Sequence, residues 1–224
     1  KLKVNFNYVV NFSGYVDHSN KQKTMRSHYY GCKNLINFFK KKKIINFIQI
    51  GSSMEYGNAK SPHKEKLQCK PKGTYAIAKY KATKYLQEIG RKENFPFTIL
   101  RLYQVYGPYQ YKNRLIPIVI DACIKKKKFA CSNGSQIRDF LYVDDLIKLI
   151  IKLIKTKPKN KIYNIGAGKN TKVRTLIELI QKLIGTGTPD FGKIKMRKDE
   201  ALHNFPNINR VKKDYKWIPK YNIK

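Results

Sequence analysis

The chain has 224 residues, enough for one large domain or two small ones, and its 42% hydrophobic content allows a buried core. Its formal charge of +34 comes from 48 basic residues, mostly lysine, against 14 acidic ones. Asn, Ile, Tyr and Phe are also plentiful, a mixture typical of A/T-rich coding DNA. The charge therefore does not by itself predict a nucleic-acid-binding protein.

The sequence also argues against membrane, secreted and metal-binding classes. No stretch approaches the roughly 18 apolar residues of a membrane span, and Asn5 and Asn7 interrupt the apolar run at the start of the chain. The four cysteines lack C-x-x-C spacing, and the four histidines are far apart in sequence. We therefore expect a cytoplasmic protein with reduced thiols, no membrane partner and no metal site.

Strand-like and helix-like stretches alternate through the first half of the chain. Residues 8–12, 44–50 and 97–102 are apolar stretches typical of buried strands. Between them, residues 23–42 and 74–91 are helix-like. Strands separated by helices of this length predict an α/β fold, a parallel sheet with helices on both faces.

The pattern loosens in the second half of the chain. We expect helices at 115–124, 143–155 and 173–184, short strands at 129–131 and 161–165, and an irregular tail.

Four tyrosines have a lysine four residues later: Tyr29, Tyr56, Tyr75 and Tyr80. Lysine is so common here that one such match means little, but the context of Tyr75 sets it apart. The segment I-Q-I-G-S-S ends a predicted strand, and P-K-G-T-Y-A-I-A-K later begins a predicted helix. Another strand and the segment R-L-Y-Q-V-Y-G-P follow.

This order of segments predicts a catalytic group made of Ser52, Tyr75 and Lys79. Residues four apart share one face of a helix, so the Lys79 ammonium is expected to lower the pKa of the Tyr75 phenol from about 10. Tyr75 would then be a usable general acid or base. Ser52 ends a strand, where open α/β sheets bind ligands, and can hydrogen-bond the same substrate oxygen. The alternative is an exposed Tyr and Lys on an ordinary helix.

Several further segments resemble, in the same order, the motifs of the NAD-dependent epimerase/dehydratase family of extended short-chain dehydrogenases/reductases. They are Y-V-V-N-F-S-G, G-C-K-N-L-I, R-L-Y-Q-V-Y-G-P, N-G-S-Q-I-R-D-F-L-Y-V-D-D-L, Y-N-I-G-A-G and W-I-P. The resemblance covers most of the chain. It implies a truncated NAD(P)-binding Rossmann domain over residues 1–107. Residues 108–224 would mainly form a smaller sugar-nucleotide-binding subdomain, with some segments returning to the first domain.

The resemblance also implies cofactor contacts. Asn11, Phe12 and Ser13 fall at positions that line the dinucleotide, NAD or NADP. Tyr75 lies beside it, and Lys79 would anchor the nicotinamide ribose.

Substrate contacts follow in the same way. Gln104 falls at a substrate-binding position, and Arg138 and Arg197 would contact the diphosphate of a nucleoside-diphosphate sugar. A guanidinium suits this role because it makes paired hydrogen bonds to phosphate oxygens. The alternative for Arg138 is a surface ion pair with Asp139 or Asp144.

Some positions depart from the family pattern. Gln104 stands where members usually have a substrate-binding asparagine, which puts the substrate contact of Gln104 in doubt. His28 stands where many members have an asparagine near the cofactor. The 4,6-dehydratases carry an Asp-Glu pair where this chain has Ser53 and Met54, and methionine cannot transfer protons. We therefore disfavour a 4,6-dehydratase. Glu55 follows one position later and is expected to be an ordinary loop residue rather than a substrate contact.

The sequence contains no G-x-x-G-x-x-G turn, which in the family receives the dinucleotide pyrophosphate. We therefore expect the chain to begin near the fourth strand of the family's sheet and to stop before a final helix. It would be a fragment, or a truncated gene product, of a longer enzyme, with an unpaired sheet edge.

The expected function is that of an NAD(P)-dependent epimerase or 4-ketoreductase acting on a nucleoside-diphosphate sugar. Family members are often dimers, so a homodimer is a further expectation. One alternative is a non-catalytic module that binds sugar nucleotides. Another is a basic nucleic-acid-binding protein, whose binding would weaken with salt.

Overall fold

The main sheet combines strands from both halves of the chain. The computed structural model describes residues 6–17, 19–196 and 200–223. Four parallel strands lie in the order β1–β2–β3–β8: β1 (Tyr8–Asn11), β2 (Asn46–Ser52), β3 (Phe97–Leu102) and β8 (Lys161–Ile165). Every residue of β2 is buried, as expected of a central strand covered on both faces. The predicted α/β fold with a parallel sheet is confirmed.

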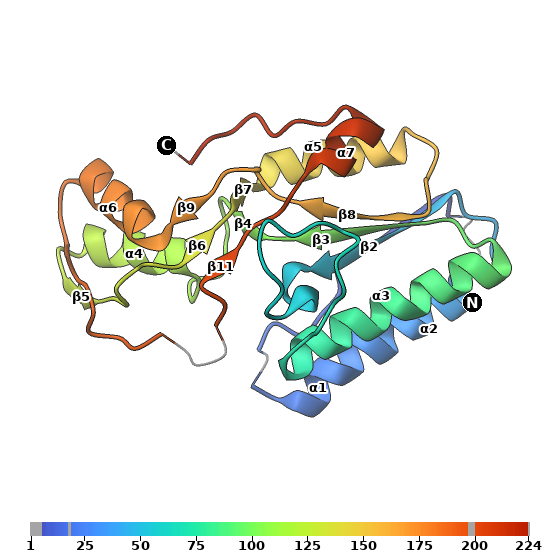
Figure 1. Ribbon diagram of the computed structural model, residues 1–224, viewed down its shortest axis with the longest axis horizontal. Coiled ribbons are helices and arrows are strands. Elements are labelled where there is room, and N and C mark those ends of the chain that lie inside the picture. Colours follow the sequence, from blue (N-terminus) through green and yellow to red (C-terminus); the bar gives the residue numbers. More distant parts are fainter. Residues whose placement is uncertain (1–5, 18, 197–199, 224) are drawn as a thin grey trace.

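One face of the sheet is covered by helices from the first half of the chain. They are α1 (Lys21–Met25), the π-helical turn η1 (Arg26–Gly31), α2 (Cys32–Phe39) and α3 (Gly73–Glu93). Figure 1 shows α2 and α3 side by side along this face. Ile36 of α2 and Leu86 of α3 are fully buried against Phe47 and Ile99 of the sheet. The single helix expected over residues 23–42 is thus interrupted by the π-helical turn.

The opposite face is covered by α5 (Val143–Ile154) and α7 (Asn209–Tyr215). Leu149 and Leu153 of α5 pack with Val211 of α7 against Ile48 and Leu100 of the sheet. The helices therefore lie on both faces, as predicted, and β2 and β3 are buried between them, while the edge strand β1 is only partly buried.

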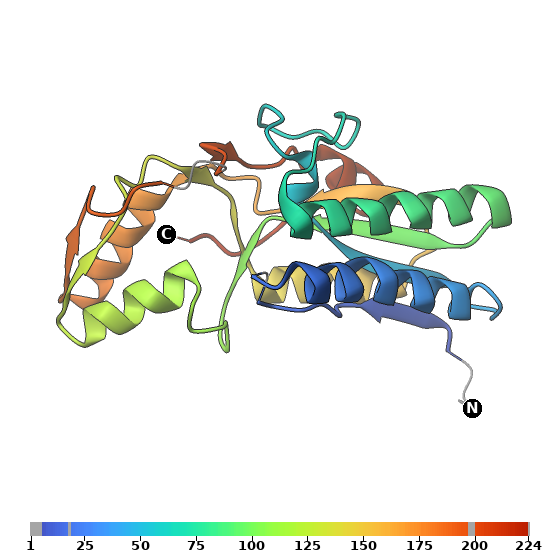
Figure 2. The ribbon, with the colours of Figure 1, turned by 90° about the horizontal axis from the view of Figure 1, so that it is seen from below.

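A smaller lobe lies beside the sheet, as Figure 2 shows. Its helices α4 (Leu115–Ile124) and α6 (Val173–Ile184) pack together, and its short strands form small sheets. These strands are β5 (Lys128–Ala130), β6 (Ile137–Arg138), β9 (Thr171–Lys172), β10 (Thr188–Asp190) and β11 (His203–Asn204). The pair β4 (Gln104–Tyr106) and β7 (Phe140–Tyr142) joins this lobe to the main sheet.

The second half of the chain returns to the main sheet twice, through α5 with β8 and through α7. The division into residues 1–107 and 108–224 stays a prediction. Within the described part of the chain, no helix is both long and apolar enough to cross a membrane.

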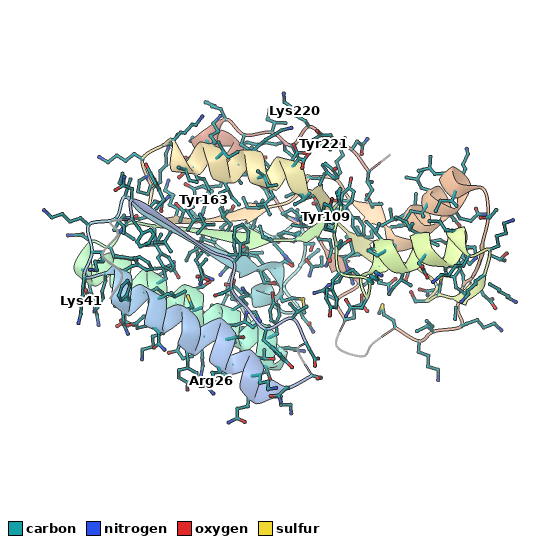
Figure 3. All side chains as sticks on the ribbon, turned by 180° about the vertical axis from the view of Figure 1, so that it is seen from behind. Arg26, Lys41, Tyr109, Tyr163, Lys220 and Tyr221 are labelled. Atoms are coloured by element: carbon teal, nitrogen blue, oxygen red, sulfur yellow. The ribbon has the colours of Figure 1, made fainter. Side chains whose placement is uncertain are left out.

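The expectation of an irregular tail is wrong. Residues 209–215 form α7, where Val211 and Tyr215 are buried one helical turn apart. Beyond it the chain runs beside α5, where Lys220 and Tyr221 lie in Figure 3. The Asp145 carboxylate accepts hydrogen bonds of 2.9 Å from the backbone N–H groups of both residues. Apolar periodicity does not predict this helix, because its sequence is rich in charged residues and has only two apolar positions, Val211 and Tyr215.

Two adjacent isoleucines of α5 test the core assignment. Ile150 is 8% exposed and Ile151 is 47% exposed. We expect Ile150→Ala to lower the free energy of unfolding by about 2–5 kcal/mol, because it removes buried methyl groups and leaves a cavity. Ile151→Ala should cost less than about 1 kcal/mol. Urea unfolding measures both, and equal losses would contradict the packing described above.

Candidate active site

Ser52 is held at the carboxyl end of β2 by its own backbone turn. The chain passes from β2 into the 3-10 helix η2 (Ser53–Tyr56). The Ser52 hydroxyl accepts a hydrogen bond of 3.2 Å from the Met54 N–H, and the Ser52 N–H donates to Glu55 Oε1 at 2.9 Å. This reciprocal cap ends the strand and begins the short helix. It fixes the serine at the edge of the sheet.

Tyr75 reaches the same place from the first turn of α3. Ser52 and Tyr75 both line a cavity of about 510 Å³. The Lys79 ammonium lies 5.9 Å from the centre of the Tyr75 ring and donates to the Ile50 carbonyl at 2.9 Å. The structure thus brings the three residues of the expected catalytic group together.

The expected lowering of the Tyr75 pKa is wrong in this structure. Burial raises the pKa of Tyr75 above its usual 10, and the charge of Glu55 raises it further. The hydrogen bond with Ser52 and the positive charge of Arg114 lower it in part. Burial also lowers the pKa of Lys79, while the Glu55 carboxylate opposes that shift. Desolvation of the phenolate therefore outweighs the nearby charges.

The far side of the cavity comes from the smaller lobe and its connection. Gln104 of β4 and Arg138 of β6 line it. The cavity is also lined by the exposed Lys72, which precedes α3, and by the exposed Arg114, whose charge acts on Tyr75. Lys72 and Arg114 were not predicted as site residues, because an exposed cation in so lysine-rich a chain has no distinguishing sequence pattern. The cavity thus combines two hydroxyl groups with the cationic side chains of Lys72, Arg114 and Arg138.

Arg138 is almost fully buried and fixed by several acceptors. One nitrogen donates to the Ile137 and Leu202 carbonyls, at 2.9 and 3.1 Å. The other pairs with the Glu200 carboxylate at 2.5 Å. In the described part of the chain its ion-pair partner is therefore Glu200, and the alternative of Asp139 or Asp144 is wrong. Arg197 lies outside the described residues.

The segment expected to line the cofactor follows β1. Asn11 is buried, donates to Gln49 Oε1 at 2.8 Å and accepts hydrogen bonds from the Ser13 N–H and hydroxyl. Phe12 is 59% exposed. Residues 11–13 lie at the same edge of the sheet as Ser52, but they do not line the cavity that Ser52 and Tyr75 share.

His28 connects this segment to Tyr75. A ring nitrogen of His28 lies 3.0 Å from the Tyr15 carbonyl oxygen. The ring meets the Tyr75 ring edge to face, with 4.9 Å between centres. The π-helical turn η1 carries His28, and such turns are frequent at functional sites.

The other Tyr–Lys pairs lie elsewhere. Tyr29, Tyr80 and Lys84 line a separate hollow on the outer side of the helices. The Tyr56 phenol is buried and donates to Asn164 Oδ1 at 2.7 Å. Context, and not spacing alone, therefore separated Tyr75 from the other three matches.

Glu55 is neither a loop residue nor a substrate contact. It is fully buried, and its carboxylate pairs with the buried Arg101 of β3 at 2.9 Å. The sequence carried one signal of this pair, since arginine in the apolar strand F-T-I-L-R-L needs a buried acceptor. The partner is 46 residues away in the chain, so local pattern does not identify it.

The structure forms no site for a metal ion and no disulfide among the residues it describes. No group of three or more His, Cys, Asp or Glu side chains in that part of the chain is placed to hold a metal. Cys32, Cys69, Cys123 and Cys131 are all free thiols.

Asp139 supports the cavity from behind. Its buried carboxylate accepts hydrogen bonds from the backbone N–H groups of Ala167, at 2.5 Å, and Lys169, at 3.0 Å. A side chain at position 166 would meet this carboxylate, which explains Gly166. Burial raises the pKa of Asp139 from 3.8 to about 6, although these hydrogen bonds oppose the shift.

This raised pKa predicts a pH-dependent stability. Between pH 3.8 and about 6 the unfolded chain loses the Asp139 proton first, so folding weakens as pH rises through that window. Relative to Asp139→Asn, the protein should lose up to about 3 kcal/mol of unfolding free energy across it. Urea unfolding at several pH values measures the difference. A difference that does not change with pH would contradict the assignment.

The chain is similar to known proteins in both sequence and fold. A family model described as "NAD dependent epimerase/dehydratase family" matches residues 2–166. CDP-abequose synthase of Salmonella typhimurium is 29% identical over 153 residues, covering 63% of this chain and 50% of that protein. Human dTDP-D-glucose 4,6-dehydratase is 30% identical over 160 residues, covering 68% of this chain and 45% of that protein. The chain thus spans about half the length of these curated relatives.

Among solved structures, UDP-glucuronic acid 4-epimerase from Bacillus cereus, in complex with UDP-glucuronic acid and NAD, superposes with a TM-score of 0.89. The match covers 97% of this chain and 71% of that one at 23% identity, so it speaks for the Rossmann-like fold. The family model covers most of the sequence. The chain therefore belongs to the NAD-dependent epimerase/dehydratase family.

Proposed function

We propose that the protein carrying this chain performs NAD(P)-dependent redox chemistry at a hydroxyl-bearing carbon of a nucleoside-diphosphate sugar, as a 4-epimerase or a 4-ketoreductase. The observation that carries the proposal is the shared cavity. Ser52 and Tyr75 offer hydroxyl groups to it, and Arg138 lines it as well. A sugar at the hydroxyls and a diphosphate at the cations would fit this polarity. The net charge of +34 would also attract an anionic substrate.

The residues present fit the nicotinamide end of a dinucleotide. The segment after β1 lies at the same carboxyl edge of the parallel sheet as the Tyr75 phenol and the buried Lys79 ammonium, and such folds bind ligands at that edge. We assign Asn11, Phe12 and Ser13 to one side of this site and Lys79 to the ribose. When bound, NAD or NADP supplies the hydride acceptor or donor.

The proton transfer falls to Tyr75. In the oxidative direction its phenolate takes the proton of the sugar hydroxyl, and in the reductive direction its phenol returns one. Ser52 hydrogen-bonds the same oxygen and orients it. Lys79, protonated beside the ring, stabilises the phenolate form once it appears. An epimerase uses both directions on opposite faces of the sugar carbon, and a reductase uses the second.

The cavity wall favours these reactions over a 4,6-dehydration. Met54 is 44% exposed and lines the cavity next to the buried Ser53, at the positions where a dehydratase has its acid and base. The Glu55 carboxylate beside Ser52 is occupied by Arg101 and by the Ser52 N–H, and the Glu200 carboxylate that lines the cavity is paired with Arg138. Elimination of water needs additional proton transfers that neither Ser53 nor Met54 is suited to supply.

Replacement of the phenol tests the proposal. The protein and its Tyr75→Phe variant are incubated with NAD and UDP-glucose, UDP-glucuronic acid or dTDP-glucose, and the sugars are followed by NMR. We expect Tyr75→Phe to lower turnover at least about 100-fold, because the group that transfers the proton is lost. Binding of the sugar nucleotide, measured by calorimetry, should change less than about threefold.

Tyr80→Phe is the matched control, since Tyr80 also precedes a lysine by four residues but faces the outer hollow. It should leave turnover unchanged. Normal turnover in Tyr75→Phe would refute the proposed role. Binding without turnover in the parent protein would instead favour the non-catalytic module.

Arg138 provides a separate test of the diphosphate end. We expect Arg138→Lys to weaken UDP binding about tenfold, because lysine cannot reproduce two parallel hydrogen bonds to phosphate oxygens. Arg174→Lys is the control, since Arg174 pairs with Glu178 on the surface of α6. Equal UDP affinity in the parent and Arg138→Lys, measured by calorimetry, would exclude Arg138 from the site.

A further inference from the structure

A fully buried ion pair lies directly behind the serine end of the cavity. Glu55 is 0% exposed and Arg101 is 2% exposed. Two guanidinium nitrogens, Nε and Nη2, each lie 2.9 Å from Glu55 Oε2. Buried ion pairs contribute little net stability, because both charges must leave water. Stability is therefore a poor explanation for this pair.

The pair depends on a glycine at the end of β2. Gly51 lies opposite Arg101 in the register of β2 and β3. A Cβ atom at position 51 would lie 2.7 Å from Glu55 Oε1 and 3.3 Å from the Arg101 side chain. The missing side chain leaves the space in which the carboxylate and the guanidinium meet. The sequence G-S-S-M-E therefore lets the helix after β2 fold its glutamate back over the strand.

The other carboxylate oxygen holds Ser52. Glu55 Oε1 accepts the Ser52 N–H at 2.9 Å, while Oε2 is held by Arg101. Arg101 itself is braced by the Tyr56 ring, whose centre lies 4.6 Å from the guanidinium carbon. Ser52 is the residue whose side chain lines the cavity beside Tyr75. A rigid buried group thus sets the position of the serine backbone.

Glu55 also faces the charges of the proposed catalytic group. Its carboxylate raises the pKa of Tyr75 and opposes the fall that burial imposes on the pKa of Lys79. The remaining groups that act on these two residues are Ser52 and Arg114 on Tyr75, and Cys32 on Lys79.

The Arg101 side of the pair faces different groups. The pKa of Arg101 is raised by Glu55, and Tyr56 and Cys69 act in the same direction.

We propose that Glu55, locked by Arg101, is a positioning residue that fixes the backbone of Ser52 and supplies a negative charge that acts on Tyr75 and Lys79. It acts through these residues and does not touch the substrate. The inference rests on the proposed function, but it concerns a group that function did not use.

A change of one atom separates the charge of Glu55 from its shape. In Glu55→Gln the shape is kept and the negative charge is gone, while one acceptor oxygen remains for either the Ser52 N–H or Arg101. We expect both limbs of the pH–rate profile, measured with NAD and whichever of the three sugar nucleotides turns over, to move down by about one pH unit. The direction follows because loss of the carboxylate lowers the pKa of both Tyr75 and Lys79. Glu93→Gln, which breaks the surface pair with Lys40, is the matched control and should not move either limb.

Loss of activity with unmoved limbs would mean that Glu55 is merely structural and would overturn the proposal. If Glu55→Gln does not fold, the double variant Glu55→Gln/Arg101→Gln removes both buried charges. Its limbs should still move to lower pH, because Arg101 acts on Tyr56 and Cys69 rather than on Tyr75. The shift should be smaller than in Glu55→Gln, because a positive charge is lost together with the negative one. Unmoved limbs of the pH–rate profile in a folded double variant would also overturn the proposal.

Hydrogen exchange at the Ser52 amide tests the positioning without substrate. We expect Glu55→Ala to accelerate this exchange at least about tenfold, because the amide loses its acceptor. Glu93→Gln should leave it nearly unchanged. Unchanged exchange in Glu55→Ala would overturn the positioning role. This measurement does not require turnover. A protein inactive with all three sugar nucleotides would refute the proposed function, and the exchange rate of the Ser52 amide would still test the positioning role of Glu55.

Discussion

The parallel pairing of β1, β2 and β3 determines where the functional groups lie. Because these strands run in the same direction, their carboxyl ends meet at one edge of the sheet. Ser52 ends β2, Asn11 ends β1, and Gln104 follows the end of β3. The helix α3 then starts over the same edge and contributes Tyr75. The candidate site is therefore a consequence of strand direction before any side chain is considered.

Polar groups buried behind this edge hold it in shape. Arg101 with Glu55 fixes the end of β2, and Asp139 fixes the loop after β8. The Tyr56 phenol donates to Asn164 on β8. Each of these groups is satisfied by hydrogen bonds, which limits the penalty of burying it. Their common effect is to fix the wall of the cavity, since buried ion pairs are weak sources of net stability.

Periodicity predicted the elements whose apolar residues face one layer. Helices 115–124 and 173–184 and strands 97–102 and 161–165 agree with the structure residue for residue. The short strands of the smaller lobe were missed because two or three residues carry no period. Pairing with distant segments forms them, as in β6 with β11, where Arg138 lies opposite Asn204.

The order of motifs, rather than any one of them, placed Ser52, Tyr75, Gln104 and Arg138 in one cavity. The electrostatics were less accessible from the sequence. A neighbouring lysine suggested a lowered Tyr75 pKa, but the degree of burial, which raises it, depends on the packed structure. The role of Glu55 was hidden for a similar reason, because its partner Arg101 comes from another strand. Local sequence specified which groups are present, and tertiary packing decided which of them interact.

The central claim is that one sugar oxygen meets the Ser52 and Tyr75 hydroxyls together. A crystal structure of the protein with NAD and a UDP-sugar tests it most directly. The account predicts a sugar oxygen within about 2.6–3.2 Å of both hydroxyl oxygens, with the diphosphate against Arg138. A sugar ring bound outside this cavity, or one whose oxygens contact neither hydroxyl, would contradict it.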